Sequence, residues 1–400
     1  MSKRLWLLVS LLVLASMLLS ACGPAAATSK DLVFGMLLVG PYNDKGYSQA
    51  HYDAGKYVEG KIPGSKMIYL DKVNVGDRPG TTPDKLAEDL LAQGATVIVF
   101  NSDDMKDAAV AFAQKHPEVP VVHASGDGSW KDGKDFKDIK NLYNIMGRME
   151  YGKMMAGCSA ALTTQTGQIG YLGPLINDET RRLVSSAYLG AEYCWTKYLG
   201  KDAADLKFKV TWIGFWFNIP GVTSDPTQVA DDFFNSGYDV VISGIDTTEA
   251  LVEANKITAG GKKVSAVPYD FKGACDGAPD VCLGVPYFNW GPAYLNLFKK
   301  VQDGKFAAGF EWNGPDWADI NNPDTSAIGF VKGKALSADA AANLDKFIGE
   351  LSGGLNLWKG PISLQDGTEY LKDGEVGTDI QVWYLPQLLK GMEGQSVPSN

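Results

Sequence analysis

Histidine is scarce in this chain, which holds only three among 400 residues, at positions 51, 116 and 123. The sequence also lacks the GxSxG nucleophile motif, the HExxH zinc motif and the Walker phosphate loop. The glycine-containing stretch 167–173 does not match the GxGxxG dinucleotide fingerprint. Without these groups the common hydrolase, metalloprotease and nucleotide-dependent classes are disfavoured. We therefore expect a protein that is not an enzyme and needs no cofactor.

Cysteine is also rare, and no CxxC pair is present among the five residues, so we expect no zinc or other metal site. Four cysteines remain when Cys22 is set aside. Cys275 and Cys282 lie seven residues apart in a loop rich in Gly, Asp and Pro, and we favour a disulfide between them. Cys158 and Cys194 would then join two adjacent helices, although spacing alone leaves three connectivities open.

Positive charge is outweighed by negative charge, because 37 Lys and Arg face 47 Asp and Glu and the formal net charge is −10. Binding to the phosphates of nucleic acids requires clustered basic residues, so we expect no nucleic-acid partner. Beyond residue 30 no stretch is long and apolar enough to span a bilayer.

The first 22 residues have the layout of a lipoprotein signal. Lys3 and Arg4 precede the apolar run 5–19, and Leu-Ser-Ala-Cys follows at 19–22. Cleavage before Cys22 would leave a lipid-bearing cysteine at the new N-terminus, with residues 23–30 as a tether. We expect an exported protein anchored to the outer face of the cytoplasmic membrane; the alternative is an ordinary signal peptide with an incidental cysteine.

The remainder of the chain alternates between short apolar strands and helices, the pattern of parallel sheets covered on both faces. The expected elements of the first half are strands 32–39, 67–70, 96–100 and 120–123, with helices 48–59, 83–93 and 106–116. A second set contains strands 168–172, 207–213, 239–243 and 263–267, with helices 179–198, 227–236 and 248–258.

Two similar α/β units indicate two lobes with a cleft between them. We expect an N-terminal lobe over 31–147 and a C-terminal lobe over 148–285. Residues 286–400 are expected to form crossover segments and a tail that completes both lobes. The predicted fold class is α/β, with two doubly wound parallel-sheet lobes.

Ligands of open parallel sheets bind just beyond the carboxyl ends of the strands, and short polar and aromatic residues follow the predicted strands there. Their aromatic faces suit stacking, and their carboxylates suit hydrogen bonds from hydroxyl or ring N–H groups. In the first lobe these residues are Asn43, Asp44, Tyr47, Ser102, Asp103, Ser125 and Gly126; in the second they are Trp216, Phe217, Asp246, Tyr269 and Asp270.

Several of these residues have a purely structural interpretation as well. Asp44 and Asp246 are equally suited to cap the helices that follow them. Tyr47 is at a helix start, where many aromatic residues only pack. Arg148 is interpreted as a hinge residue paired with a carboxylate, and Trp130 as an exposed loop residue.

The stretch Gly-Pro-Tyr-Asn-Asp-Lys-Gly-Tyr at 40–47 resembles the opening of the basic membrane protein (BMP) family, which contains nucleoside-binding lipoproteins of ABC importers. Similar segments follow in the family's order over nearly the whole chain after the tether. They include His-Ala-Ser-Gly at 123–126, Gly-Arg-Met-Glu-Tyr-Gly at 147–152, Tyr-Asp at 269–270, Asn-Trp-Gly-Pro at 289–292 and Gly-Pro-Ile at 360–362.

This resemblance implies the type I periplasmic-binding-protein fold and a purine nucleoside or nucleobase as ligand. Tyr47 would stack on the base, and Trp216 or Phe217 would cover it from the other lobe. Asp270 would bind ribose hydroxyls, and Asp103 base or sugar. Asn289 and Trp290 match a segment of one branch of the family and are added to the candidate site; Trp290 also suits a core position.

The implied partners are the small ligand, the permease subunits of an ABC importer and the membrane, and we expect a monomer. Two alternatives remain open. The same fold could bind another small polar solute, such as a sugar or an amino acid, or it could act as a ligand sensor for a membrane receptor. An amino-acid site would need an Arg with Ser or Thr for the ligand carboxylate, which the strand ends do not offer.

Overall fold

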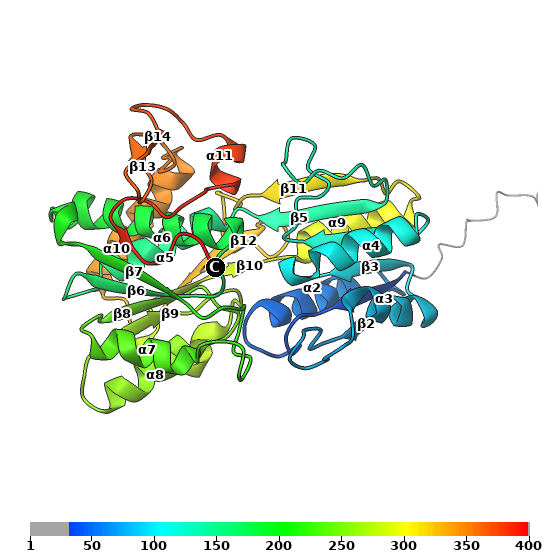
Figure 1. Ribbon diagram of the computed structural model, residues 1–400. Coiled ribbons are helices and arrows are strands. Elements are labelled where there is room, and N and C mark those ends of the chain that lie inside the picture. The colour runs from blue at the N-terminus through cyan, green and yellow to red at the C-terminus, as the bar shows by residue number, and fades with distance from the viewer. Residues whose placement is uncertain (1–31, 399–400) are drawn as a thin grey trace, which may run out of the picture.

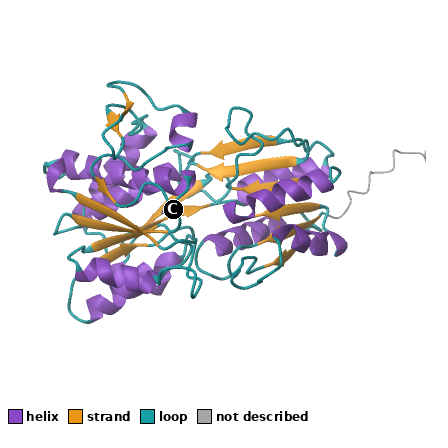
Figure 2. Cartoon of the chain, in the orientation of Figure 1, coloured by secondary structure: helices purple, strands orange, loops and turns teal. Residues whose placement is uncertain are grey.

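Two parallel β-sheets, one in each lobe, organise residues 32–398, which a computed structural model describes (Figure 1). The expected signal, the lipid-bearing Cys22 and the tether 23–30 lie outside the described residues. Helices cover both faces of each sheet (Figure 2), which is the predicted doubly wound architecture. No helix of the described part is long and apolar enough to cross a membrane.

The first lobe is built on a six-stranded sheet of order β11-β5-β4-β3-β1-β2, in which all neighbouring strands are parallel. The helices α2 and α9 pack on one another, and so do α3 and α4. Its strands are β1 Val33–Leu37, β2 Lys66–Leu70, β3 Val97–Phe100, β4 Val121–Ala124, β5 Leu142–Gly147 and β11 Gly309–Asn313. Its helices are α2 Tyr47–Lys61, α3 Pro83–Ala92, α4 Lys106–Lys115 and α9 Gly291–Gln302, with a short 3₁₀ turn, η1, at Asp103–Met105.

Strand β5 is absent from the sequence prediction, because polar Asn144 interrupts its apolar residues. In the fold this side chain is buried and has partners: its Oδ1 accepts from the Ser129 backbone N–H at 2.8 Å, and its Nδ2 lies 3.2 Å from His123 Nδ1. A central strand tolerates a buried amide when its hydrogen bonds are satisfied.

The second lobe has a five-stranded parallel sheet of order β15-β7-β6-β8-β9. Its strands are β6 Gln168–Gly173, β7 Lys207–Trp212, β8 Val240–Ser243, β9 Ser265–Val267 and β15 Met392–Glu393. Its helices are α5 Met149–Ala161, α6 Asp178–Lys197, α7 Pro226–Asn235, α8 Glu249–Ala259 and α10 Ala338–Ser352. Helices α5 and α6 pack tightly, since a Cβ on Gly157 would meet the Ala187 carbonyl oxygen at 1.8 Å.

The chain crosses between the lobes more than once. It passes from β5 directly into α5, and β10 (Gly284–Phe288) leads from the second lobe into α9 of the first. It returns from β11 through β12 (Ile328–Lys332), which pairs antiparallel with β10. The Arg148 N–H donates to the Asn313 carbonyl at 2.7 Å and ties two of these passages together.

A C-terminal strap, residues 353–398, lies against α6 and carries β13 Ile362–Ser363, β14 Glu369–Leu371 and α11 Asp379–Trp383 (Figure 1). Strand β15 within it completes the second sheet. The strap also contacts the first lobe, where the Tyr384 hydroxyl donates to Asp127 at 2.5 Å and accepts from the Lys134 N–H at 2.8 Å. Arg148 forms a bidentate pair with Asp379 of the strap, at 2.9 and 2.7 Å.

Trp130 is not the exposed loop residue expected from the sequence. Its ring stacks on Phe310 at 4.8 Å and on Tyr384 of the strap at 6.0 Å, and it meets Trp383 edge-on at 5.5 Å. The partners come from segments more than 170 residues away, which local composition cannot reveal.

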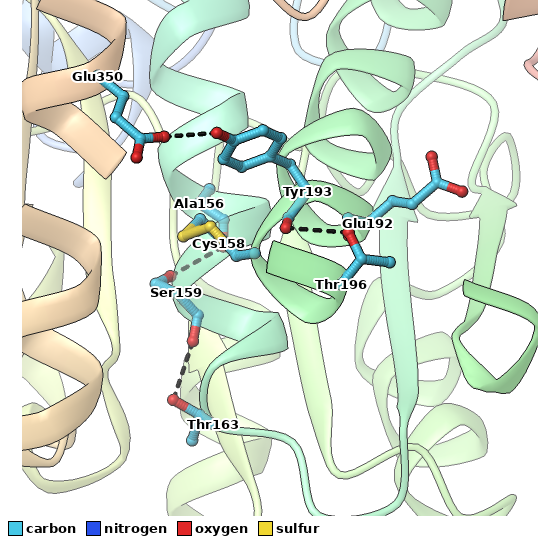
Figure 3. The surroundings of a disulfide bond; sticks show 9 residues. Ala156, Cys158, Ser159, Thr163, Glu192, Tyr193, Thr196 and Glu350 are labelled. Carbon is cyan, nitrogen blue, oxygen red and sulfur yellow. Dashed lines mark hydrogen bonds between the residues drawn. A yellow bond between two sulfur atoms is a disulfide. The ribbon is translucent and has the colours of Figure 1, made fainter. Parts of the chain in front are cut away.

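Both disulfides join the pairs favoured from the sequence, and both lie in the second lobe. Cys158 and Cys194 link α5 to α6, with Cα atoms 5.2 Å apart (Figure 3). On the same side of α6 the Tyr193 hydroxyl donates to Glu350 of α10 at 2.5 Å, so three helices are tied together there.

Candidate functional site

One cavity of about 280 Å³ lies where the two lobes meet. Nine residues line it: Tyr47, Ser102, Asp103, Ser125, Glu179, Trp216, Asp246, Tyr269 and Asp270. Eight of the nine belong to the set predicted from the strand ends.

The first lobe supplies its side of the cavity from the carboxyl ends of two neighbouring strands and from the start of α2. Ser102 and Asp103 follow β3, and Ser125 follows β4. Ser125 has a positive φ of 76°, a left-handed conformation that is uncommon for serine and turns the chain sharply beside the cavity. Tyr47 is the first residue of α2, and its ring packs edge-on against His51 at 4.6 Å.

The second lobe supplies Trp216, Asp246 and the pair Tyr269–Asp270 from the segments after β7, β8 and β9. Asp270 has a φ of 70° and is fully buried. Its backbone is held in this conformation by two hydrogen bonds, to the carbonyl of Pro286 and from the N–H of Phe288, both 3.1 Å long. Strained backbone of this kind is retained only where the surroundings enforce it, and it often marks a binding site.

Polar atoms without a partner gather around the cavity. The hydroxyls of Tyr47, Ser125 and Tyr269 and both carboxylate oxygens of Asp270 are buried and have no partner in good hydrogen-bond geometry, although the Tyr269 hydroxyl is near enough to Asp270 to oppose the rise in the pKa of its carboxyl. Buried polar groups in folded proteins are nearly always satisfied, so a cluster of this kind is suited to a ligand that offers both donors and acceptors.

Charge in the cavity wall is strongly one-sided, because four carboxyl groups line it and no Lys or Arg does. Burial raises the pKa of the Glu179 carboxyl to about 7 and that of Asp103, Asp246 and Asp270 above the usual range. Lys153 lies behind the wall, and burial lowers the pKa of its amine to about 7.

Direct contacts hold the lobes together at this point. Asn177, the N-cap of α6, donates from Nδ2 to Asp103 Oδ2 of the first lobe at 3.1 Å. Gly46 lies so near the backbone of Asp246 that a Cβ on it would be 1.6 Å from the Asp246 carbonyl oxygen. The cavity is therefore enclosed by two lobes in contact.

Six residues of the predicted set lie outside the lining. Asn43 is exposed. Asp44 caps α2 instead, because its carboxylate accepts from the N–H groups of Gly46, Ser48 and Gln49 at 2.8 to 3.0 Å. Asp246, the other candidate cap, makes no such bond. The N-cap residue of α8 is Thr248, and its side chain forms no capping hydrogen bond.

The other four contact neighbouring residues outside the cavity lining. Gly126 lies against the His123 ring, which a Cβ would meet at 2.2 Å, and Phe217 packs edge-on to Phe215 at 5.1 Å. Asn289 donates to two backbone carbonyls of the β11–β12 connection. Trp290 stacks on His51 at 4.4 Å and is a core residue, as its structural interpretation allows.

Glu179 is the lining residue that the sequence analysis missed. It stands in the first turn of α6 rather than directly after a strand, so the strand-end rule does not find it. The available signal was Asn-Asp-Glu-Thr at 177–180, an N-terminal capping sequence that also places an acidic residue at the head of a helix after β6.

No group of three or more His, Cys, Asp or Glu side chains within residues 32–398 is arranged to hold a metal ion.

Comparison with known proteins gives a family match and a structural match. Residues 32–256 match the model of the Bmp family, described as ABC transporter substrate-binding protein PnrA-like. A purine-binding protein of Brucella abortus is 28% identical over 360 residues, 89% of this chain and 91% of that protein. A putative ABC transporter glucose-binding protein of Haloferax volcanii is 23% identical over 272 residues, 68% of this chain and 61% of that protein.

The fold is also found in solved structures. A crystal structure of an ABC transporter solute-binding protein from Aeropyrum pernix superposes with a TM-score of 0.62 at 13% identity, covering 84% of this chain and 93% of that one. The likeness confirms the predicted fold class.

Proposed function

Because the chain belongs to the family of PnrA-like ABC transporter substrate-binding proteins, we propose that its interlobe cavity binds a purine base or nucleoside for delivery to a membrane permease. Members of this family are binding components of transporters and not enzymes. The proposal concerns the identity of the ligand and the residues that hold it.

The observation that carries the proposal is the composition of the cavity wall. Tyr47 enters from the first lobe and Trp216 from the second, so a flat ring has an aromatic side chain on each lobe to pack against. Around them are the buried, unpartnered polar atoms of Ser125, Tyr269 and Asp270, which suit the edge of a purine or the hydroxyls of a ribose.

The similarity to a purine-binding relative over nine-tenths of both chains supports this choice of ligand. The glucose-binding relative makes a sugar the second candidate, and aromatic rings with carboxylates suit sugars too. An amino acid is disfavoured, since no arginine lines the cavity to pair with its carboxylate.

Ligand capture is proposed to proceed by hinge closure. The crossing segments around Arg148, Asn313 and Phe288 join the lobes on one side of the cavity, and the contacts Asn177–Asp103 and Gly46–Asp246 lie across the gap. A ligand that touches both lobes favours the form in which these contacts exist, and its differential affinity drives the closure.

The sequence supports further proposals about location and organisation. Lipid attached to Cys22 would hold the exported protein at the outer face of the cytoplasmic membrane, near the permease. The proposed division is an N-terminal lobe over 31–147, a C-terminal lobe over 148–285 and completing segments over 286–400. We propose that the protein acts as a monomer.

The test is a thermal-shift panel on protein that starts after Cys22, unfolded and refolded beforehand to remove copurified ligand. The panel holds purine and pyrimidine bases and nucleosides, sugars and amino acids. A ligand at one hundred times its dissociation constant stabilises the fold by about 2.7 kcal/mol. A shift with purines alone supports the proposal, whereas a shift with sugars and none with purines overturns the ligand.

A further inference from the structure

A second cavity lies between the crossing segments and the C-terminal strap. Its volume, with the open mouth included, is about 420 Å³, and it shares no lining residue with the interlobe cavity. Three of its lining residues, Arg148, Glu150 and Tyr151, come from the segment 147–152, which supplies nothing to the interlobe cavity. Trp312 of β11 and Asp379 of the strap line it as well. Parts of both lobes and of the strap therefore meet at this cavity.

Two polar atoms of the lining side chains have no partner in good hydrogen-bond geometry within residues 32–398. They are Glu150 Oε2, an acceptor, and Trp312 Nε1, a donor, and both residues are more than nine-tenths buried. Other polar groups of the lining are satisfied, since the Asn356 side chain accepts from the Trp358 N–H at 2.9 Å and Trp358 Nε1 donates to Ser186 at 3.1 Å. Buried polar atoms nearly always have partners, so one open acceptor and one open donor are suited to a ligand.

Charges of both signs surround the cavity. Arg182 donates from Nε to Glu150 Oε1 at 2.8 Å, and its Nη2 is also buried without a partner in the described part of the chain. Burial raises the pKa of the Glu150 carboxyl, and the guanidiniums of Arg182 and Arg148 oppose this rise. At the more exposed end of the lining, Arg148 pairs with Asp379. Two guanidiniums thus balance two carboxylates.

The indole of Trp312 is held firmly in place. The Arg148 guanidinium lies over its ring, 4.1 Å from the centre, and that of Arg182 lies 5.7 Å from the centre. Arg148 Nε also donates to the Trp312 carbonyl at 3.1 Å. Contacts over the ring leave the N–H at its edge free to donate. A fixed donor beside two positive charges suits a negatively charged group of a ligand.

From these open atoms we infer that the second cavity binds a small zwitterion of the amino-acid type, with its ammonium group on Glu150 Oε2 and its carboxylate on Trp312 Nε1. Each charged group of such a ligand satisfies one buried atom that the protein leaves open. Met154, Trp358 and Val382 add apolar surface to the lining, which suits a small apolar side chain. A ligand with only one of the two charges would leave a buried polar atom unsatisfied, which is unfavourable.

The two cavities therefore differ in the chemistry that they accept. No arginine lines the interlobe cavity, which disfavours an amino acid there, whereas Arg148 lines the second cavity and Arg182 contacts its Glu150. The inference goes beyond the proposed function and does not depend on which ligand the interlobe cavity takes.

The experiment combines titration calorimetry with NMR of the indole N–H groups, on refolded protein that starts after Cys22. The probes are glycine, alanine, valine and proline, together with propionate and ethylamine, which each keep one of the two charged groups of alanine. We expect saturable binding of alanine and a shift of the Trp312 indole signal. Propionate and ethylamine should bind about tenfold or more weakly, because each leaves one buried atom open. This comparison uses the wild type and needs no variant to fold.

Two tryptophan variants test the position of the ligand. Trp312→Phe keeps a ring but removes the N–H, so it should weaken alanine binding about tenfold, and the missing signal identifies the Trp312 indole. Trp195→Phe is the matched control, because Trp195 is buried and donates to the Asp202 carbonyl at 2.9 Å, outside both cavities. It should leave alanine binding unchanged.

A third variant separates this inference from the proposed function. Trp216→Ala alters the interlobe cavity and should leave alanine binding intact, while Trp312→Phe should leave purine binding intact. Loss of alanine binding in Trp216→Ala but not in Trp312→Phe would place the amino acid in the interlobe cavity and overturn the inference. Propionate or ethylamine binding as tightly as alanine would overturn the zwitterion. Absence of binding by all four amino acids, with the Trp312 signal unmoved, would show that the second cavity holds only water.

Discussion

The contact between Gly46 and Asp246 offers a direct test of lobe closure. A methyl group on Gly46 would lie 1.6 Å from the Asp246 carbonyl oxygen and 2.5 Å from its carbon, whereas real Cβ contacts essentially never fall below 3.0 Å. The two backbones would therefore have to separate by about 1.4 Å, the difference between 3.0 and 1.6 Å. Backbone cannot rotate away as a flexible side chain can, so Gly46→Ala should prevent full closure.

We expect Gly46→Ala to weaken the binding of the ligand. Forcing extra atoms into a packed contact costs about 1–3 kcal/mol, and a clash of backbone with Cβ belongs at the upper end. About 3 kcal/mol corresponds to a dissociation constant on the order of 100-fold weaker. The open form has no such contact, so the melting temperature without ligand should stay close to that of the wild type, while stabilisation by ligand is largely lost.

Titration calorimetry and small-angle X-ray scattering provide the measurements, with the ligand identified by the thermal-shift panel. Gly60→Ala is the control, because Gly60 lies near the far end of α2, the helix that Gly46 precedes, and a Cβ there meets nothing within 4 Å. It should bind normally and become more compact with ligand, as the wild type does. Wild-type affinity in Gly46→Ala would refute the reasoning, since the ligand-bound form would then not contain this contact.

Three further predictions concern stability and can be checked by urea unfolding. Asp44→Ala removes the cap of α2 and should lower the free energy of unfolding by about 1–2 kcal/mol with little change in ligand affinity; a large loss of affinity would instead make Asp44 a ligand contact. Arg182→Met leaves the Glu150 carboxylate buried and unpaired and should cost about 3–5 kcal/mol, part of which the added change Glu150→Gln should restore; an unchanged stability would show that this pair contributes nothing. The double change C158A/C194A removes the disulfide whose cysteines are 36 residues apart and should lower the free energy of unfolding by about 4 kcal/mol. Removing the Cys275–Cys282 disulfide, whose cysteines are seven residues apart, should lower it by about 2 kcal/mol; equal losses would contradict the dependence on loop length.

The order of strands and helices was largely predictable because it depends on local pattern. Continuous apolar runs such as 97–100 and 240–242 indicate buried parallel strands, and the structure places strands β3 and β8 there. The carboxyl-end rule then located most of the cavity lining without any knowledge of distances. These features are encoded within a few residues of one another.

The features of the site that the sequence did not predict depend on contacts between segments far apart in the chain. Phe217 follows β7 as Trp216 does, yet the one packs against Phe215 and the other lines the cavity. Trp290 differs from Tyr47 only in what surrounds it, since both are buried aromatic residues near the junction of the lobes. Glu179 was missed because its helix, and not its strand, points its side chain at the site. No spacing rule separates such cases.

The strap and the crossing segments also determine how late in synthesis each of the two sheets becomes complete. The first sheet lacks its β11 edge until residues 309–313 are made, and the second lacks β15 until residues 392–393. A ribosome supplies residues from the N-terminus, so neither lobe can be complete while its own first strands are being synthesised. The second sheet therefore cannot gain its β15 edge before residues 392–393 have been made, so both lobes reach their full set of strands only late in synthesis.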